Sequence, residues 1–186
     1  MGVIGVHEFI TLDGVIESPS WSFDYSFDPK MGEAIGQIMG SSKAILLGRR
    51  TFEEFAPAWF TRTAEDDPGA PFMNETPKCV VSASLQAADW SNSSVLGPYR
   101  ASTIGDLKDR IDGNIYVSGG GTLVRALLAD GLVDDLRLFV YPLVHGGGQR
   151  LFADTGPATR FALAGSEAYS NGVLYLTYTL AASGRG

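Results

Sequence analysis

The amino-acid sequence predicts a three-layer α/β/α fold whose central sheet is mostly parallel and ends in antiparallel strands. Short, wholly apolar strands such as Ala44–Leu47 alternate with helices through residues 3–129, and such strands are typical of a parallel sheet covered on both faces. The last two strands are instead joined near Asn171-Gly172, a typical hairpin turn. Strand–helix–strand units followed by a hairpin therefore indicate one mixed α/β sheet.

The composition is typical of one globular domain. The chain has 186 residues, of which 45% are hydrophobic and 19% are charged. This length suffices to bury a core, and this balance argues against disorder. We expect a single domain over residues 1–182 and a flexible tail over residues 183–186.

Charge and residue counts exclude several classes of protein. With 14 Lys and Arg against 21 Asp and Glu, the net charge is −7, which argues against nucleic-acid binding because phosphate contacts need a basic face. The single cysteine, Cys79, excludes an intrachain disulfide and a thiolate metal cluster, and His7 and His145 offer little for zinc. No apolar run reaches the roughly 18 residues of a membrane span, and no signal peptide is recognised. We therefore expect a cytoplasmic protein with no metal and no membrane partner.

The first strand and helix follow from hydrophobicity and capping signals. Residues 3–12 form a β-rich apolar stretch, which predicts a buried strand that ends before Asp13-Gly14. Asp28 followed by Pro29 is typical of a helix N-terminus, because the aspartate caps the helix and proline suits its first position. Apolar residues at helical spacing extend this helix to about residue 42.

A second unit pairs the strand at residues 44–47 with a helix. Thr51 and Glu54 have the Ser/Thr-x-x-Glu spacing of a capping box, which predicts a helix that starts at Thr51. Pro57 is expected to stop it. The proline-containing segment 61–78 is expected to be a polar loop, and loops of this length are usually functional or mobile.

The same signals predict the remaining elements. Thr103 is expected to cap a helix that reaches about residue 111, and Gly131 is expected to terminate a later helix. Alternating apolar and polar residues predict the C-terminal strands. The predicted strands cover residues 79–81, 95–96, 114–117, 135–141, 161–167 and 173–180, and the later helix covers residues 122–129.

Two strand-to-helix turns have the features of an anion site. The turn Gly48-Arg49-Arg50-Thr51 combines the free N–H groups of a helix N-terminus with two guanidinium groups, which suits a phosphate. In the turn at Gly119-Gly120-Gly121, followed by Thr122 and Leu123, three glycines let the backbone approach a ligand closely. Two solvated arginines on an ordinary turn, and a plain tight turn, are the alternatives. Two such turns in one domain favour a dinucleotide, and Ser82 and Ser84 are candidates for a third phosphate contact.

Three acids are candidates for proton transfer. Asp13 lies at the end of the first strand, where open α/β sheets bind their ligands, and Asp28 and Glu33 lie at the start of the following helix. A buried carboxyl group there can donate a proton to a substrate, but Asp28 has the helix cap as an alternative role. Trp21 either walls a pocket for a flat heterocycle or belongs to the core.

In their order and spacing these motifs resemble the dihydrofolate reductase-like superfamily. The resemblance is closer to the reductase domain of the riboflavin-biosynthesis deaminase–reductase proteins, and it runs from about residue 3 to residue 180. It is carried by Trp21, Met73-Asn74 and the segments Leu12–Ile16, Leu47–Glu53, Pro77–Ser82, Ile115–Leu123, Gly131–Leu138, Pro142–Val144 and Gly146–Phe152.

The resemblance implies an NADPH-dependent reductase that transfers hydride to a pyrimidine or pteridine-like heterocycle. It implies that Gly48, Arg49, Arg50 and Thr51 face the adenosine phosphate side of the cofactor and that Gly119–Leu123 hold the pyrophosphate. It also implies that Ser82 and Ser84 contact the 2′-phosphate. On the substrate side it points to Trp21 and Asn74, with Asp13 as a polar anchor near the nicotinamide and Asp28 or Glu33 as acids.

The sequence departs from the family at two places. Ala83 and Ser84 follow Ser82 where many relatives carry an arginine, which leaves Arg49 and Arg50 as the main contacts for the 2′-phosphate. Dihydrofolate reductases carry one acid near the start of the first helix, and no acid here matches it cleanly. The alternatives to the riboflavin-type reductase are a true dihydrofolate reductase and a nucleotide-binding protein that has lost the chemistry.

The C-terminal strands predict a homodimer. The strand at residues 173–180 carries large side chains on both faces, whereas an antiparallel strand at the edge of a sheet normally shows one polar face to water. A second copy of the same surface is the commonest cover, although helices of the same chain are the alternative.

Overall fold

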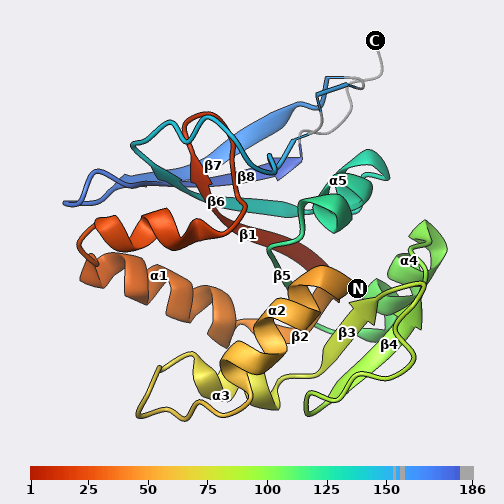
Figure 1. Ribbon diagram of the computed structural model, residues 1–186. Helices are drawn as coiled ribbons and strands as arrows, with labels where there is room; N and C mark the ends of the chain where they lie inside the picture. Colours follow the sequence, from red (N-terminus) through yellow and green to blue (C-terminus); the bar gives the residue numbers. More distant parts are fainter. Residues whose placement is uncertain (153, 156–157, 181–186) are drawn as a thin grey trace.

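The computed structural model describes residues 1–152, 154–155 and 158–180. In this part of the chain eight strands form one sheet in the order β4-β3-β2-β5-β1-β6-β8-β7 (Figure 1). Neighbouring strands from β4 to β6 are parallel, whereas β8 is antiparallel to both β6 and β7. The strands are β1 (Val3–Thr11), β2 (Ser42–Gly48), β3 (Lys78–Val81), β4 (Ser93–Gly97), β5 (Asn114–Ser118), β6 (Asp135–Tyr141), β7 (Phe161–Ala168) and β8 (Leu174–Leu180).

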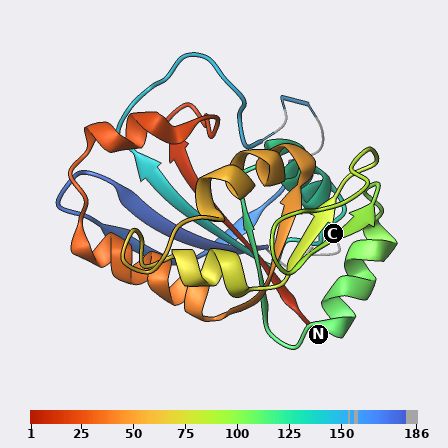
Figure 2. The ribbon, with the colours of Figure 1, turned by 60° about the horizontal axis from the view of Figure 1, so that its bottom comes forward.

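Helices cover both faces of the sheet, which confirms the predicted mixed α/β architecture (Figure 2). A 3-10 helix and the first three α-helices pack on one face, and the last two α-helices pack on the other. No helix in the described part of the chain is long and apolar enough to cross a membrane. The helices are η1 (Pro19–Asp24), α1 (Pro29–Gly40), α2 (Arg49–Trp59), α3 (Ala70–Glu75), α4 (Ala101–Arg110) and α5 (Gly121–Ala129).

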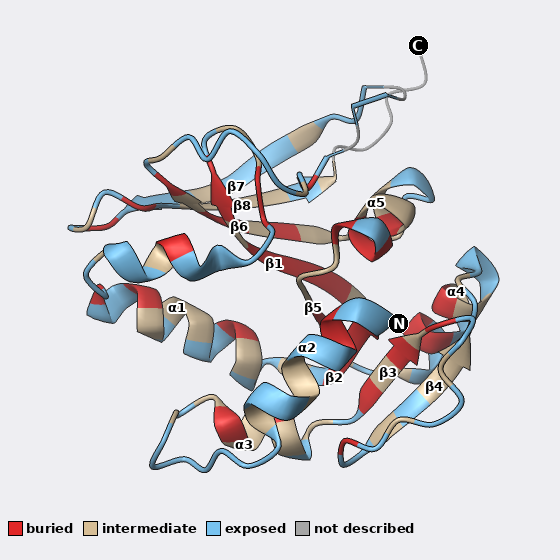
Figure 3. Cartoon of the chain, in the orientation of Figure 1, coloured by how far each residue is buried: buried red, intermediate tan, exposed pale blue. Residues whose placement is uncertain are grey.

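The sheet separates two hydrophobic clusters, and β1 contributes to both. Val6 and Ile10 belong to the cluster beneath α4 and α5, whereas Phe9 packs against the aromatic cluster beneath α1, α2 and α3. Figure 3 shows β1 and β2 buried between these layers, while β7 at the edge is largely exposed. Burying the central strands on both faces fixes the positions of their carboxyl ends, from which the functional loops emerge.

Two helix ends form as the capping signals predict. The carboxylate of Asp28 accepts a hydrogen bond from the Lys30 N–H at 2.9 Å and caps α1. Gly131 has a φ of 66°, and the Leu132 N–H donates to the Leu127 carbonyl at 2.9 Å. This is the left-handed glycine termination that satisfies the last carbonyls of a helix.

The predicted boundaries of α2 are wrong. The helix begins at Arg49 with Gly48 at the N-cap, so Thr51 lies inside the first turn and no side chain caps the helix. The side chain of Thr51 is buried against another turn of the chain, so it is not available for capping. Pro57 does not stop the helix, which continues to Trp59, because a proline removes one hydrogen bond and a helix end with packed neighbours tolerates that loss.

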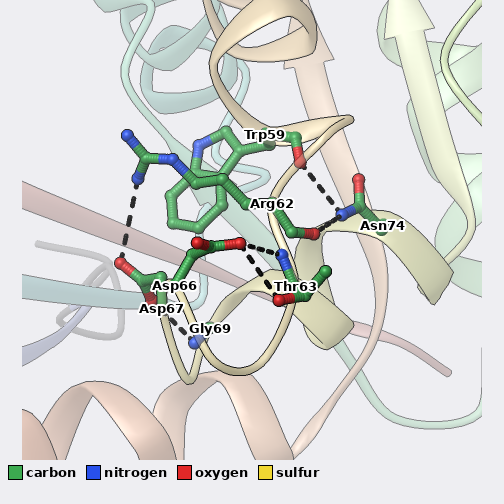
Figure 4. A network of polar contacts seen from close by, with 7 residues as sticks. All are labelled: Trp59, Arg62, Thr63, Asp66, Asp67, Gly69 and Asn74. Carbon is green, nitrogen blue, oxygen red and sulfur yellow. Dashed lines mark hydrogen bonds and ion pairs between the residues drawn. The ribbon is translucent and has the colours of Figure 1, made fainter.

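Two further expectations are corrected. The helix α4 begins at Ala101 and not at Thr103, and no side chain caps it; burial of Ile104 and Leu107 under the sheet sets its position. The expected loop at residues 61–78 contains α3. Figure 4 shows how this segment closes on itself: the Asn74 amide donates to the carbonyls of Trp59 and Arg62. The expected tail at residues 183–186 lies outside the described residues.

A buried lysine closes the C-terminal end of α3. Lys78 is only 1% exposed, and its ammonium donates to the carbonyls of Met73, Asn74 and Thr76 at 2.8, 3.2 and 2.9 Å. The same ammonium lies 4.5 Å from the centre of the Trp90 ring, within cation–π range. Three carbonyl acceptors at a helix end replace the water that the charge loses on burial.

We expect Lys78→Met to lower the free energy of unfolding by about 2–3 kcal/mol, because it leaves three carbonyls without their charged donor. Urea denaturation of both proteins measures the difference. The matched control is Lys43→Met, since Lys43 is exposed on β2, and its effect should stay within about 0.5 kcal/mol. Equal stability of the two variants would show that the Lys78 ammonium contributes nothing.

Candidate functional site

A cleft of about 420 Å³ lies at the carboxyl ends of β2, β3 and β5, where α2 and α5 begin. Parallel α/β sheets bind ligands at this edge. The N-termini of α2 and α5 both face this cleft, so their unpaired N–H groups and positive partial charges point toward it. The two turns that the sequence predicts as anion sites therefore come together. The cleft is lined by Gly48, Arg49, Arg50, Thr51, Val81, Tyr99, Gly120, Thr122, Leu123, Ala126 and Gln149.

The glycine turn before α5 packs directly against the first turn of α2. Gly119 and Gly120 have φ values of 68° and 74°, in the left-handed region that favours glycine. A Cβ at Gly120 would lie 2.8 Å from the Thr51 Oγ1, and a Cβ at Gly119 would lie 3.1 Å from the Thr51 Cγ2. Only glycine therefore allows the two turns to meet at Thr51, and this contact holds the two helix N-termini side by side.

The rim of the cleft is polar and carries two arginines. The Arg49 guanidinium pairs with Glu53 at 2.8 Å, and both side chains are about half exposed, at 50% and 47%. Arg50 is exposed and makes no ion pair with the described residues. On the opposite side, the Gln149 amide lies 3.4 Å from the Thr122 hydroxyl. Exposed guanidinium groups beside helix N-termini suit a phosphate-bearing ligand.

The rest of the cleft wall is apolar. Val81, Leu123 and Ala126 contribute aliphatic surface, and Tyr99 contributes a half-buried ring. The Tyr99 hydroxyl donates to the Asp130 carboxylate at 2.7 Å, which holds the ring in place. Burial, followed by this hydrogen bond, raises the pKa of Tyr99 above its usual value, so the phenol stays protonated. An apolar wall next to a cationic rim can hold a flat ring and a phosphate in one ligand.

The two predicted serine contacts, one and three positions beyond Val81, are not among the residues that line the cleft. The buried Ser82 hydroxyl accepts hydrogen bonds from the backbone N–H groups of Ser84 and Leu85 at 3.2 and 2.9 Å. It therefore forms the turn that follows β3. The side chain of Ser84 is exposed.

Asp13 anchors a loop. Its carboxylate accepts hydrogen bonds from the Thr11 hydroxyl at 2.6 Å and from the backbone N–H groups of His145 and Gly146 at 3.0 and 2.9 Å. The Thr11 hydroxyl first, and then these two amides, hold the pKa of Asp13 well below its usual range. Asp13 is therefore ionised and has no proton to donate at neutral pH.

Asp28 and Glu33, like Asp13, are not among the residues that line the cleft. Besides capping α1, Asp28 accepts hydrogen bonds from the N–H and the hydroxyl of Ser170 at 2.9 and 2.7 Å. These bonds, led by the hydroxyl, lower the pKa of Asp28, so it also stays ionised. Its role is to tie α1 to the β7–β8 turn. Glu33 is exposed on α1.

The two predicted substrate contacts have structural partners. Trp21 is buried and packs edge-on against Tyr141, with ring centres 5.1 Å apart. Asn74 uses its amide group to close the segment described above, and its carbonyl oxygen accepts from the Trp90 indole at 2.8 Å. Both residues lie on the α1–α3 side of the sheet and outside the lining of the cleft.

Two neighbouring polar residues lie inside β1: His7, which the sequence indicated to be a poor candidate for zinc, and Glu8, which was not among the candidate residues predicted from sequence. The His7 Nδ1 lies 3.0 Å from the Tyr116 hydroxyl, and burial lowers the pKa of His7 to about 4. Glu8 is 4% exposed, and burial raises its pKa to about 8. Both groups are therefore neutral at pH 7. The available signal was an acid within an otherwise apolar strand, since buried acids are rare without a partner or a function.

Comparison with other proteins identifies relatives over nearly the full length of the chain. The protein YyaP of Bacillus subtilis (strain 168), whose function is uncharacterised, is 26% identical over 182 residues, which cover 91% of this chain and 90% of YyaP.

Solved structures share the fold. A protein of Shewanella sp. PV-4, provisionally named as a riboflavin biosynthesis protein, superimposes with a TM-score of 0.80 at 18% identity and covers 97% of this chain and 99% of its own. The deaminase/uracil reductase of Thermotoga maritima has a TM-score of 0.68 at 17% identity, over 96% of this chain and 56% of the enzyme. Dihydrofolate reductase from Enterococcus faecalis, complexed with NADP(H), has a TM-score of 0.60 at 16% identity, over 97% of both chains.

These likenesses agree on the fold, and a family model settles the family. The model of the RibD C-terminal domain matches residues 3–175. This match runs from the start of β1 to the first two residues of β8 and includes every residue that lines the cleft. The chain belongs to the RibD C-terminal domain family.

Proposed function

We propose that this protein is an NADPH-dependent reductase of the riboflavin-biosynthesis type. The observation that carries the proposal is the meeting of two helix N-termini, two arginines and an apolar wall in one cleft. This arrangement matches the chemistry of a dinucleotide, which presents several phosphates and a flat base. The deaminase/uracil reductase of Thermotoga maritima and the NADP(H) complex of the Enterococcus dihydrofolate reductase support the assignment at the level of the fold.

The residues of the cleft have separate roles in this proposal. The N–H groups at the start of α5, after Gly119–Gly121, would hold the pyrophosphate, and Arg49 and Arg50 would bind the 2′-phosphate. The Tyr99 ring, fixed by Asp130, would pack against the adenine. When bound, NADPH supplies a hydride to an electrophilic carbon of the substrate, for which we propose a pyrimidine or pteridine-like heterocycle.

NADPH should stabilise the folded protein. A ligand at about 100 times its dissociation constant adds roughly 2.7 kcal/mol to the free energy of unfolding. The melting temperature, measured with and without millimolar NADPH, tests this. An unchanged melting temperature would contradict the proposed function, whereas stabilisation without turnover of any pterin or pyrimidine would favour a nucleotide-binding protein without catalysis.

Replacing both rim arginines should abolish the preference for NADPH over NADH. Arg49→Ala with Arg50→Ala removes the charged donors from the 2′-phosphate, and a hydrogen bond to a charged group contributes about 1.5–3 kcal/mol, or roughly 10- to 150-fold in affinity. Dissociation constants for both dinucleotides give the preference. The matched control is Arg62→Ala, since Arg62 is exposed and outside the cleft. If the double variant keeps the wild-type ratio of the dissociation constants for NADPH and NADH, other residues discriminate between the two dinucleotides.

A second copy of the chain is the proposed cover for the outer face of β7 and β8. The register Leu163↔Tyr178 and Ala168↔Leu174 places these side chains on one face. Leu163 and Leu174 are 59% and 43% exposed. Exposed apolar side chains at the edge of a sheet favour association of two like surfaces.

Light scattering at micromolar concentration should therefore give a mass of about 40 kDa, twice the 19.8 kDa of one chain. Leu163→Asp should shift the mass to that of one chain, because it buries a charge at the contact. Glu167→Gln, at an exposed position of the same strand, is the control and should leave the dimer intact. A wild-type mass near 20 kDa would refute the dimer.

A further inference from the structure

The position of Glu8 in the sheet places it beside the cleft's glycine turn. Pairing between β1 and β5 ends at His7↔Ser118, where β5 turns away into Gly119. The strand β1 continues and pairs with β6 alone, with Glu8 opposite Leu138. Glu8 therefore lies level with Gly119, the first residue of the glycine turn. The next residue of this turn, Gly120, lines the cleft.

The side chain of Glu8 is enclosed in apolar surroundings. It points to the same side of β1 as Val6 and Ile10, which belong to the hydrophobic cluster beneath α4 and α5. Its Oε1 atom is buried and has no hydrogen-bond partner among the described residues, none of which forms an ion pair with Glu8. An unpaired carboxylate is costly in such a place, so the neutral acid is the stable form.

The surroundings of Glu8 also tie it to the glycine turn. Burial raises its pKa to about 8, and the Gly119 backbone amide opposes this rise by favouring the ionised form. The Gly119 amide, which favours the ionised form of Glu8, thus belongs to the turn that precedes α5. A negative charge at Glu8 would compete with an incoming phosphate for the positive end of this helix.

We propose that Glu8 is a proton-linked positioning residue of the dinucleotide site. As a neutral acid it supports the glycine turn while anionic phosphates bind at the start of α5, and its ionisation opposes that binding. The inference rests on the proposed function, because it requires NADPH to occupy this turn. It extends that function by predicting that cofactor affinity depends on one buried proton.

His7 and Tyr116, which are buried neighbours of Glu8, titrate outside its range. Burial keeps the pKa of His7 near 4 and raises that of Tyr116 above its usual value. The arginines stay charged at every pH considered, and the phosphate groups of NADPH are fully ionised above pH 7. The titratable and charged groups on the elements around Glu8 are His7 on β1, Tyr116 on β5, Asp135, Arg137 and Tyr141 on β6, Arg125 on α5, and Asp13, Glu17, His145 and Arg150 in the adjoining loops.

The test is the dissociation constant of NADPH, followed by cofactor fluorescence from pH 7 to pH 9. If only the protonated form binds, wild-type affinity should fall about tenfold over this range. Glu8→Gln keeps the size and hydrogen-bonding capacity of a neutral acid, so its affinity should change less than about twofold. Glu54→Gln, the same exchange at an exposed position of α2, is the matched control and should follow the wild type.

A second measurement reads the protonation of Glu8 directly. Difference infrared spectroscopy should show a band of a protonated carboxyl group that disappears from the wild type as the pH rises past 8, and that is absent from Glu8→Gln. If Glu8→Gln fails to fold, Glu8→Met replaces it in both measurements.

The outcomes separate the two proposals. Tight NADPH binding whose pH dependence is the same in Glu8→Gln and the wild type would overturn the role of Glu8 and leave the proposed function standing. A flat wild-type profile would do the same. Failure of the wild type to bind NADPH at pH 7 would overturn the proposed function, and this inference with it.

Discussion

The contact between Thr51 and the glycine turn is the constraint on which the site depends. A Cβ at Gly120 would clash with Thr51 and a Cβ at Gly119 would crowd it, so glycines allow the two turns to approach closely. The strand order places β2 next to β5, which brings the starts of α2 and α5 to the same edge. Separating the turns would divide the positive ends of two helices between two places, and the field on a single ligand would weaken.

The part of the fold that was predictable from sequence is the part set by local periodicity. Apolar runs gave every strand to within a few residues, and Asp28 and Gly131 marked two helix ends correctly. The failures occurred where tertiary contacts override a local preference. Thr51 has the spacing of a capping residue, yet it is committed to a glycine turn almost seventy residues away. The helix α3 was missed because its end is closed by Lys78, whose contacts follow from packing and not from a pattern.

In the candidate site, too, the features set by a local pattern were predictable and those set by distant contacts were not. Its turns were predictable, because glycines and arginines between a strand and a helix are a local signal for anion binding. The roles of the acids were not, since these depend on partners distant in sequence: Asp13 meets His145, and Asp28 meets Ser170. Each carboxylate accepts three hydrogen bonds, which lower its pKa and favour its ionised form. Glu8 is the opposite case, an acid whose only sequence signal is its place in an apolar strand and whose buried Oε1 atom has no hydrogen-bond partner among the described residues.

The electrostatics of the cleft explain how an acidic chain can hold an anion. A net charge of −7 repels phosphates at long range, but salt screens that repulsion beyond roughly 10 Å. Near the cleft the fixed helix ends and Arg50 act at short range. Arg49 is paired with Glu53 in an exposed contact, which contributes about 0.3–0.5 kcal/mol. A ligand phosphate can therefore recruit Arg49 at little cost, because the pair that it displaces is weak. A charge buried beneath the turn would oppose the ligand without such screening, and for this reason the neutral state of Glu8 matters more to the proposed site than the net charge spread over the surface.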